Sequence, residues 1–139
     1  DFPKADYVVL GVGTGGTLTG LARIIRKRYP NLKIIAVEPF ESSVLQGLPK
    51  GPHKIQGIGA GFVPPLLETK EVDRIISIAS ADAMNKAKLL ARQGLFLGIS
   101  SAAAILASEI VADQVKNAVI LTVAPDGGAK YISTGAYEN

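Results

Sequence analysis

Short apolar runs alternate along the chain with longer segments in which apolar residues recur at helical spacing. The runs predict strands over Tyr7–Leu10, Lys33–Val37, Arg74–Ile78 and Asn117–Val123. The longer segments predict helices over Gly16–Tyr29, Ala81–Gln93 and Ala102–Val115. Strands rich in valine and isoleucine that alternate with helices are typical of buried parallel sheets. We therefore expect an α/β fold, a three-layer, mainly parallel sheet with helices on both faces.

Serine residues stand where the helices are expected to begin. Ser80 is the expected N-cap of the second helix, and Ser42 or Ser43 that of a short helical turn. One of Ser100 and Ser101 would cap the third helix. The other serine of that pair could then face a ligand.

The turn between the first strand and the first helix is rich in glycine and predicts an anion site. Residues 10–17 read Leu-Gly-Val-Gly-Thr-Gly-Gly-Thr. A strand that enters a helix through glycines exposes backbone N–H groups at the positive end of the helix dipole, where phosphate groups bind. Thr14 and Thr17 add hydroxyl donors. Phosphate binding is therefore the working hypothesis for this turn.

Two other interpretations of the same turn remain open. Gly11-x-Gly13-x-x-Gly16 matches the dinucleotide fingerprint, and Glu38 follows at about the offset of a ribose contact, which would make the chain an NAD-binding Rossmann domain. The threonines favour a terminal phosphate monoester instead, because a pyrophosphate needs bare backbone. The third interpretation is a tight turn without a ligand.

A long stretch, residues 47–62, follows neither period and is rich in glycine and proline. Such a stretch is either a disordered linker or a functional loop. Its apolar residues (Ile55, Ile58 and Phe62) and the spacing of Gly57, Gly59 and Gly61 favour a packed loop whose backbone approaches something closely.

Composition excludes several classes of site. The chain of 139 residues has no cysteine and a single histidine, His53, which excludes disulfides and thiolate metal sites and argues against a histidine metal cluster or a serine–histidine triad. No apolar run is long enough to span a bilayer. The net charge of +3 is modest and the aromatic residues are not interleaved with the basic ones, so we expect neither a membrane nor a nucleic-acid partner. The absence of cysteine fits a cytoplasmic protein.

Three stretches together resemble the cysteine synthase (O-acetylserine sulfhydrylase) branch of the fold type II pyridoxal-phosphate enzymes: residues 11–20, residues 51–62 and residues 98–101. The resemblance covers nearly the whole chain in order and spacing. The glycine–threonine loop alone would also suit a relative of cystathionine β-synthase or of the serine and threonine dehydratases. Residues 51–62 are more specific and point to the sulfhydrylase branch.

The resemblance implies an activity and a set of partners. The activity is pyridoxal 5'-phosphate-dependent β-replacement, a transferase reaction that makes L-cysteine from O-acetylserine and sulfide. The implied enzyme is a cytoplasmic homodimer. Its region around His53 and Lys54 would meet the C-terminal tail of serine acetyltransferase, so a partner-binding module is a further interpretation that is compatible with the enzyme.

The resemblance also implies that residues 1–139 are the C-terminal part of the cofactor-binding large domain. The chain begins at Asp1 without a methionine, and a strand follows almost at once. In the family, the Schiff-base lysine and the loop that grips the substrate carboxylate lie upstream of these stretches. We therefore expect no catalytic residue in this chain, and no activity from the chain alone.

Site residues follow from the resemblance position by position. The cofactor phosphate would be held by Gly13, Thr14, Gly15, Gly16 and Thr17. Ser100 would hydrogen-bond the pyridine nitrogen, and Pro125 and Asp126 would lie near the ring. The amino-acid pocket would be bordered by Gln56, Gly57 and Ala60. No metal site is implied. Ala102, and residues 128–131, depart from the family pattern, which leaves the exact branch and the sulfur donor open.

Overall fold

The computed structural model describes residues 4–13, 16–61 and 72–123, and the side chains of residues 16–19 are not described. Within these residues the strands are β1 (Tyr7–Gly11), β2 (Lys33–Pro39), β3 (Arg74–Ile78) and β4 (Ile120–Thr122). The helices are α1 (Gly16–Arg28), α2 (Ser80–Arg92) and α3 (Ile99–Ala112), with short 3-10 turns at η1 (Phe40–Ser42) and η2 (Val44–Gln46). No helix in this part of the chain has the length and apolar character needed to cross a membrane.

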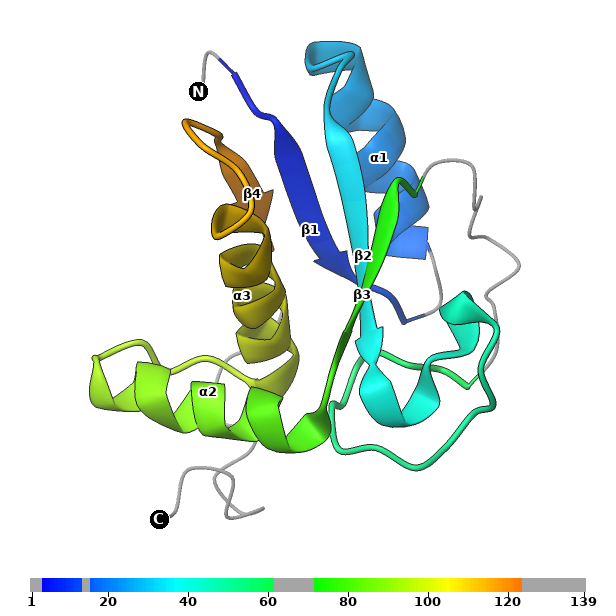
Figure 1. Cartoon of the computed structure of the whole chain (residues 1–139), viewed down its shortest axis with the longest axis vertical. Helices are drawn as coiled ribbons and strands as arrows, with labels where there is room; N and C mark the ends of the chain where they lie inside the picture. The colour runs from blue at the N-terminus through cyan, green and yellow to red at the C-terminus, as the bar shows by residue number, and fades with distance from the viewer. Residues whose placement is uncertain (1–3, 14–15, 62–71, 124–139) are drawn as a thin grey trace.

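The described strands form one parallel sheet in the order β3-β2-β1-β4 (Figure 1). β2 extends past its predicted end because Glu38 and Pro39 still pair with Ser77 and Ile78 of β3. β4 is shorter than predicted. Asn117, its expected first residue, has a φ of 54°, a left-handed backbone that turns the chain instead of extending it.

Alternate residues of the strands face opposite sides of the sheet. Val8 and Leu10 of β1 pack in one cluster with Ala22 of α1, whereas Val9 packs in another with Ala103 of α3. In Figure 1, α1 accordingly lies on one side of the sheet, and α2 and α3 lie on the other. The predicted three-layer, parallel α/β architecture is confirmed.

α2 and α3 begin earlier than predicted, at Ser80 and Ile99, and neither has the expected serine as its N-cap. The N-cap of α2 is Ala79, and the N-cap of α3 is Gly98; neither makes a side-chain cap hydrogen bond. At α2 the carboxylate of Glu41 accepts hydrogen bonds from the backbone N–H of Ser80 at 3.0 and 3.1 Å and from the Ser80 hydroxyl at 3.2 Å. A carboxylate from another segment therefore satisfies the first free backbone donor of this helix.

The short turn after β2 follows the same principle. Ser43 precedes η2, but its hydroxyl donates back to the carbonyl groups of Pro39 and Phe40 and does not cap the turn. The backbone N–H of Leu45 instead donates to Glu38 Oε1 at 2.8 Å. Of the predicted serine caps, none is the side-chain cap of its element.

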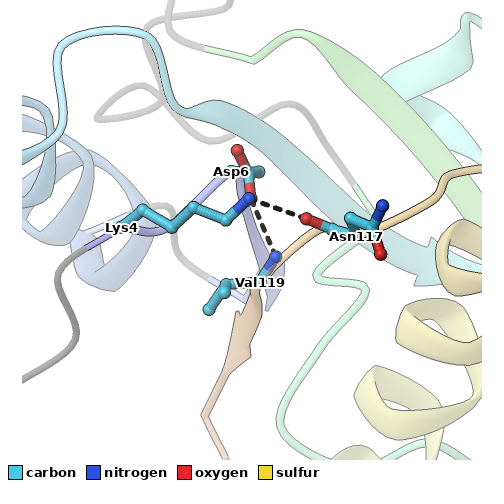
Figure 2. A network of polar contacts seen from close by, with 4 residues as sticks. All are labelled: Lys4, Asp6, Asn117 and Val119. Atoms are coloured by element: carbon cyan, nitrogen blue, oxygen red, sulfur yellow. Dashed lines mark hydrogen bonds and ion pairs between the residues drawn. The ribbon is translucent and has the colours of Figure 1, made fainter.

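A polar network ties the start of β1 to the segment before β4 (Figure 2). Val119 N donates to Asp6 Oδ2 at 2.8 Å, and Lys4 Nζ donates to the Asn117 carbonyl at 2.7 Å while lying 3.5 Å from Asp6 Oδ2. The hydrogen bond from Val119, helped by Lys4, lowers the pKa of Asp6. This network joins chain segments that are far apart in sequence.

Candidate functional site

The three stretches singled out in the sequence meet at the carboxyl edge of the sheet. β1 ends at Gly11, and α1 begins at Gly16, so their connection lies at that edge. α3 leads into the parallel strand β4, so its first turn also lies toward that edge (Figure 1). Ile99 of this turn packs in one buried cluster with Ile55 and Ile58 of the long loop. Ligands of open α/β sheets bind at this edge.

The long loop lies directly on the glycine turn, backbone against backbone. Gly59 N donates to the Val12 carbonyl at 2.9 Å. A Cβ atom on Gly13 would lie 2.6 Å from the Gly57 carbonyl oxygen, and one on Gly11 would lie 2.7 Å from Ile58 Cγ2. Glycine is therefore required at both positions to admit the loop. The sequence patterns place Gly11 in the glycine turn and in its motifs but predict no contact for it, and the spacing of Gly57, Gly59 and Gly61 is the one signal of this contact.

The loop itself is packed, as predicted for residues 55 and 58. Ile55 is fully buried and Ile58 nearly so, while Gly57 and Gly59 have φ values of 92° and 67° that favour glycine. Phe62, the third predicted anchor, lies outside the described residues. What the loop backbone approaches closely is the glycine turn.

The predicted pocket residues Gln56, Gly57 and Ala60 are exposed on this loop. A small crevice brings Ala60 beside the glycine turn. It is lined by Val12, Gly13, Glu38, Val44, Leu45, Gly59 and Ala60. The structure thus places the predicted amino-acid pocket segment next to the first residue of the predicted phosphate cradle.

Glu38 does not have the role that the dinucleotide interpretation requires. Its side chain is 1% exposed, and its oxygens accept hydrogen bonds from Leu45 N at 2.8 Å and Gln46 Nε2 at 3.2 Å. Burial raises the pKa of Glu38, although both hydrogen bonds act in the opposite direction. Because this carboxylate closes the turn after β2, it is not presented to a ribose, and the fingerprint lacks its acidic partner.

The predicted cofactor residues are described to different degrees. Gly13 lies under the loop, and Gly16 and Thr17 form the start of α1, although nothing is described of the Thr17 side chain. Ser100 lies in the first turn of α3 and is 5% exposed, so it is buried without being the N-cap. The remaining predictions, Thr14, Gly15, Pro125 and Asp126, fall outside the described residues.

The donor chemistry of this edge suits a phosphate group. The first N–H groups of α1 have no partner within the helix, and its first turn has no acidic side chain that would compete with an anion. The backbone at Gly13 approaches its neighbour as closely as only glycine allows. Among the described residues, no group of three or more histidine, aspartate or glutamate side chains is placed to hold a metal ion.

Known proteins are similar to this chain in sequence. The family model described as "Pyridoxal-phosphate dependent enzyme" matches residues 1–126. A cysteine synthase from Staphylococcus aureus (strain N315) is 45% identical over 134 residues, which are 95% of this chain and 43% of that protein. The chain therefore spans less than half the length of the curated relatives that it matches.

Solved structures show the same fold. O-acetyl serine sulfhydrylase isoform 3 from Entamoeba histolytica superposes with a TM-score of 0.93 at 43% identity, covering 98% of this chain and 42% of that one. An O-acetylserine dependent cystathionine β-synthase from Helicobacter pylori superposes with a TM-score of 0.90 at 37% identity, covering 96% of this chain and 44% of that one.

Proposed function

Because this chain belongs to the family of pyridoxal-phosphate dependent enzymes, we propose that it is the C-terminal part of the cofactor-binding large domain of a cysteine synthase. The longer enzyme would release acetate from O-acetylserine and add sulfide at the same carbon, giving L-cysteine. The Schiff-base lysine would come from the rest of that enzyme. The cofactor would supply the electron withdrawal that stabilises negative charge at the α-carbon once its proton is removed, so that acetate can leave from the β-carbon.

Residues of this chain would hold and orient the reactants. The backbone N–H groups of residues 13–17, with the hydroxyls of Thr14 and Thr17, would bind the phosphate. The Ser100 hydroxyl would bind the pyridine nitrogen, with Pro125 and Asp126 near the ring. A neutral hydroxyl leaves that nitrogen unprotonated, which moderates the electron withdrawal and favours loss of the β-substituent. Gln56, Gly57 and Ala60 would border the amino acid.

The contact between the long loop and the glycine turn supports this proposal. The loop with the predicted amino-acid pocket lies on the glycine turn, through the Gly59 N–Val12 O hydrogen bond of 2.9 Å and the Gly57–Gly13 contact. A cofactor bound by its phosphate at this turn would therefore have the pocket segment beside it. A reaction that a cofactor carries out on an amino acid requires proximity of this kind.

A second candidate function, cystathionine β-synthase, differs only in the sulfur donor, which is homocysteine in place of sulfide. The structural similarity to the Helicobacter pylori protein, whose description is O-acetylserine dependent cystathionine β-synthase, favours it. An assay of the longer enzyme with O-acetylserine and either sulfide or homocysteine separates the two. Faster product formation with sulfide supports cysteine synthase, and faster formation with homocysteine overturns it.

Binding of the cofactor by this chain has its own test. Equilibrium dialysis of the longer enzyme against pyridoxal phosphate compares the wild type with Thr17→Ala and Thr17→Ser. Loss of a hydrogen bond to a charged phosphate weakens retention by about one to two decades in Thr17→Ala, and Thr17→Ser keeps the donor. Equal retention in all three proteins argues against the phosphate cradle, and retention of NAD instead would restore the dinucleotide interpretation.

We extend the proposal to a partner, the C-terminal tail of serine acetyltransferase. An open hollow of about 500 Å³ beside the loop is lined by Ser42, Lys50, Gly51, Pro52, His53, Gly59, Ala60 and Gly61. Lys50 lines this hollow and is exposed, and exposed Lys54 lines a neighbouring hollow that shares Pro52 and His53 with it. The ammonium group of either lysine suits the carboxylate at the end of a peptide. Binding of a tail peptide that weakens in Lys50→Ala or in Lys54→Ala supports this partner, and binding that is unchanged in both variants overturns it.

We also propose, on the resemblance, that the longer enzyme is a cytoplasmic homodimer. Sedimentation equilibrium tests the assembly, because a dimer has twice the mass of one chain. A mass equal to one chain at micromolar concentration overturns it.

A further inference from the structure

His53 closes the long loop on itself through both ring nitrogens. Ile55 N donates to His53 Nδ1 at 3.1 Å, and His53 Nε2 lies 2.8 Å from the Gly59 carbonyl oxygen. A nitrogen that accepts from an N–H carries no proton, and a carbonyl oxygen can only accept. The ring is therefore the neutral tautomer with its proton on Nε2, which donates to Gly59.

The two bonded positions enclose the segment that touches the glycine turn. Between them lie Gln56, Gly57 and Ile58, and Gly59 itself donates to the Val12 carbonyl at 2.9 Å. The Gly57 carbonyl rests on Gly13, as described above. One imidazole thus holds the predicted pocket segment and, through it, the start of the predicted phosphate cradle.

Gly59 is packed closely between the imidazole ring of His53 and Pro39. A Cβ atom on Gly59 would lie 2.7 Å from His53 Nε2 and 2.5 Å from Pro39 Cγ, and the residue has a φ of 67°. Glycine is therefore required where the ring meets the loop. Ile55, on the other side of the ring, is fully buried and anchors that end.

We propose that His53 is a positioning residue, whose neutral imidazole holds residues 55–59 in the conformation that serves both the amino-acid pocket and the glycine turn. The proposal rests on the proposed function for the identity of the two ligands. It differs from a partner-binding role of this region, because both ring nitrogens are engaged within the loop.

Two substitutions separate the two hydrogen bonds. His53→Asn puts an amide oxygen near the place of Nδ1 and keeps the acceptor for Ile55, but it has no donor that reaches Gly59. His53→Gln puts an amide N–H near the place of Nε2 and keeps the donor. His53→Ala removes both.

In the longer enzyme we expect His53→Asn to raise the KM for O-acetylserine by about 2- to 10-fold, the worth of one lost hydrogen bond, with a smaller change in kcat. His53→Ala, which loses both hydrogen bonds, should raise the KM at least as much. His53→Gln should restore the KM to within about 2-fold of wild type. A merely structural role would lower the melting temperature without this split between KM and kcat. An unchanged KM in His53→Ala overturns the proposal.

The ring can also be observed directly in the longer enzyme, because the ring signals that are absent from His53→Ala identify His53. Ring ¹⁵N NMR should give the Nε2-protonated tautomer, and adding pyridoxal phosphate to the cofactor-free enzyme should shift the ring signals through the Gly57–Gly13 contact. Fast averaging of both tautomers, or the Nδ1-protonated form, overturns the proposal. If the longer enzyme makes no cysteine while the tautomer and the shift are observed, the proposed function fails and the positioning role stands.

Discussion

The carbonyl oxygen of Gly57 lies 2.6 Å from the position that a Cβ atom would take on Gly13. Real Cβ atoms essentially never approach an oxygen so closely, and both partners here are backbone. The contact therefore leaves no flexible side chain that could move aside. It couples the long loop to the turn that precedes α1.

Gly13→Ala should separate these two segments. The added methyl group forces the loop away from the turn, so we expect a destabilisation of about 1–3 kcal/mol and at least a tenfold loss of affinity for pyridoxal phosphate in the longer enzyme. Chemical denaturation and equilibrium dialysis measure the two effects.

The matched control is Gly20→Ala, in the exposed part of α1. A Cβ atom at Gly20 meets nothing within 4 Å, so the substitution should stabilise the protein by about 0.5–1 kcal/mol through helix propensity. Cofactor affinity should not change in this variant. Similar affinities in the two variants would contradict the steric argument.

Ser100→Ala tests the hydroxyl that is buried at the start of α3. Because Gly98 is the N-cap, the substitution removes no side-chain cap, and we expect the main effect on the chemistry. Turnover of the longer enzyme should fall and the absorption maximum of the bound cofactor should shift, while the cofactor stays bound. Absorption spectra and steady-state kinetics are the measurements.

Ser108→Ala is the control for the same helix. Its hydroxyl donates to the Ala104 carbonyl within α3, more than two turns from Ser100. It loses a hydroxyl of the same kind, so its spectrum and turnover should match the wild type. If both variants lose activity equally, Ser100 acts through the stability of α3 and not on the cofactor.

Glu38 should make stability depend on pH above its ordinary pKa of 4.5. Burial raises the pKa of the folded state, so the folded protein binds more protons than the unfolded chain over the range between the two values. The contribution of Glu38 to the free energy of unfolding is fully present below pH 4.5 and is lost as the pH rises through the raised pKa. Relative to Glu38→Gln, the wild type should therefore lose unfolding free energy over this range.

Urea denaturation at a series of pH values measures that difference. The amide oxygen of Glu38→Gln can still accept from Leu45 N, so the turn after β2 keeps its closing hydrogen bond. A difference between the two proteins that does not vary with pH would show that the carboxyl group titrates normally.

Asp6 should act with the opposite sign. The hydrogen bond from Val119 and the nearby Lys4 lower its pKa below 3.8, so its contribution is present above 3.8 and is lost as the pH falls through the lowered value. Asp6→Asn should be less stable than the wild type at neutral pH, with a difference that shrinks at acid pH. Amide exchange at Val119, whose N–H donates to Asp6, should be faster in the variant.

Lys4→Met provides the comparison for this network. It removes the ammonium group near Asp6 Oδ2 but leaves the Val119 donor in place. Because the Val119 hydrogen bond is the larger cause of the lowered pKa, this variant should keep most of the pH dependence. A complete loss of the pH dependence in Lys4→Met would show that Lys4, and not the Val119 hydrogen bond, is the main cause of the lowered pKa.

The sequence alone determined the layers and the order of elements. Alternation of valine and isoleucine runs with helical periods predicted the parallel sheet, because each strand of such a sheet is buried on both faces. The same local signals located α1 to within a residue at each end and β3 completely. Hydrophobic period and glycine content are local properties, and they suffice for such elements.

Only the tertiary structure decided how the ends of the elements are satisfied. Glu41 caps α2 from 39 positions away. Glu38 accepts the hydrogen bond that closes the turn after β2, and its carboxylate is therefore not available to bind a ribose. Local capping rules favoured serines, but the helix ends needed only an acceptor in the right place, and a neighbouring segment supplied one. Sequence spacing cannot reveal such a partner.

The same holds for the site. The pattern of glycines predicted that a backbone comes close at residues 57–61, but not that the partner is Gly11–Gly13 or that His53 closes the loop. Hydrophobic periodicity predicts which residues are buried. Contacts between two irregular loops depend on how the sheet places their ends, and that is decided only when β1, β2 and α3 pack together.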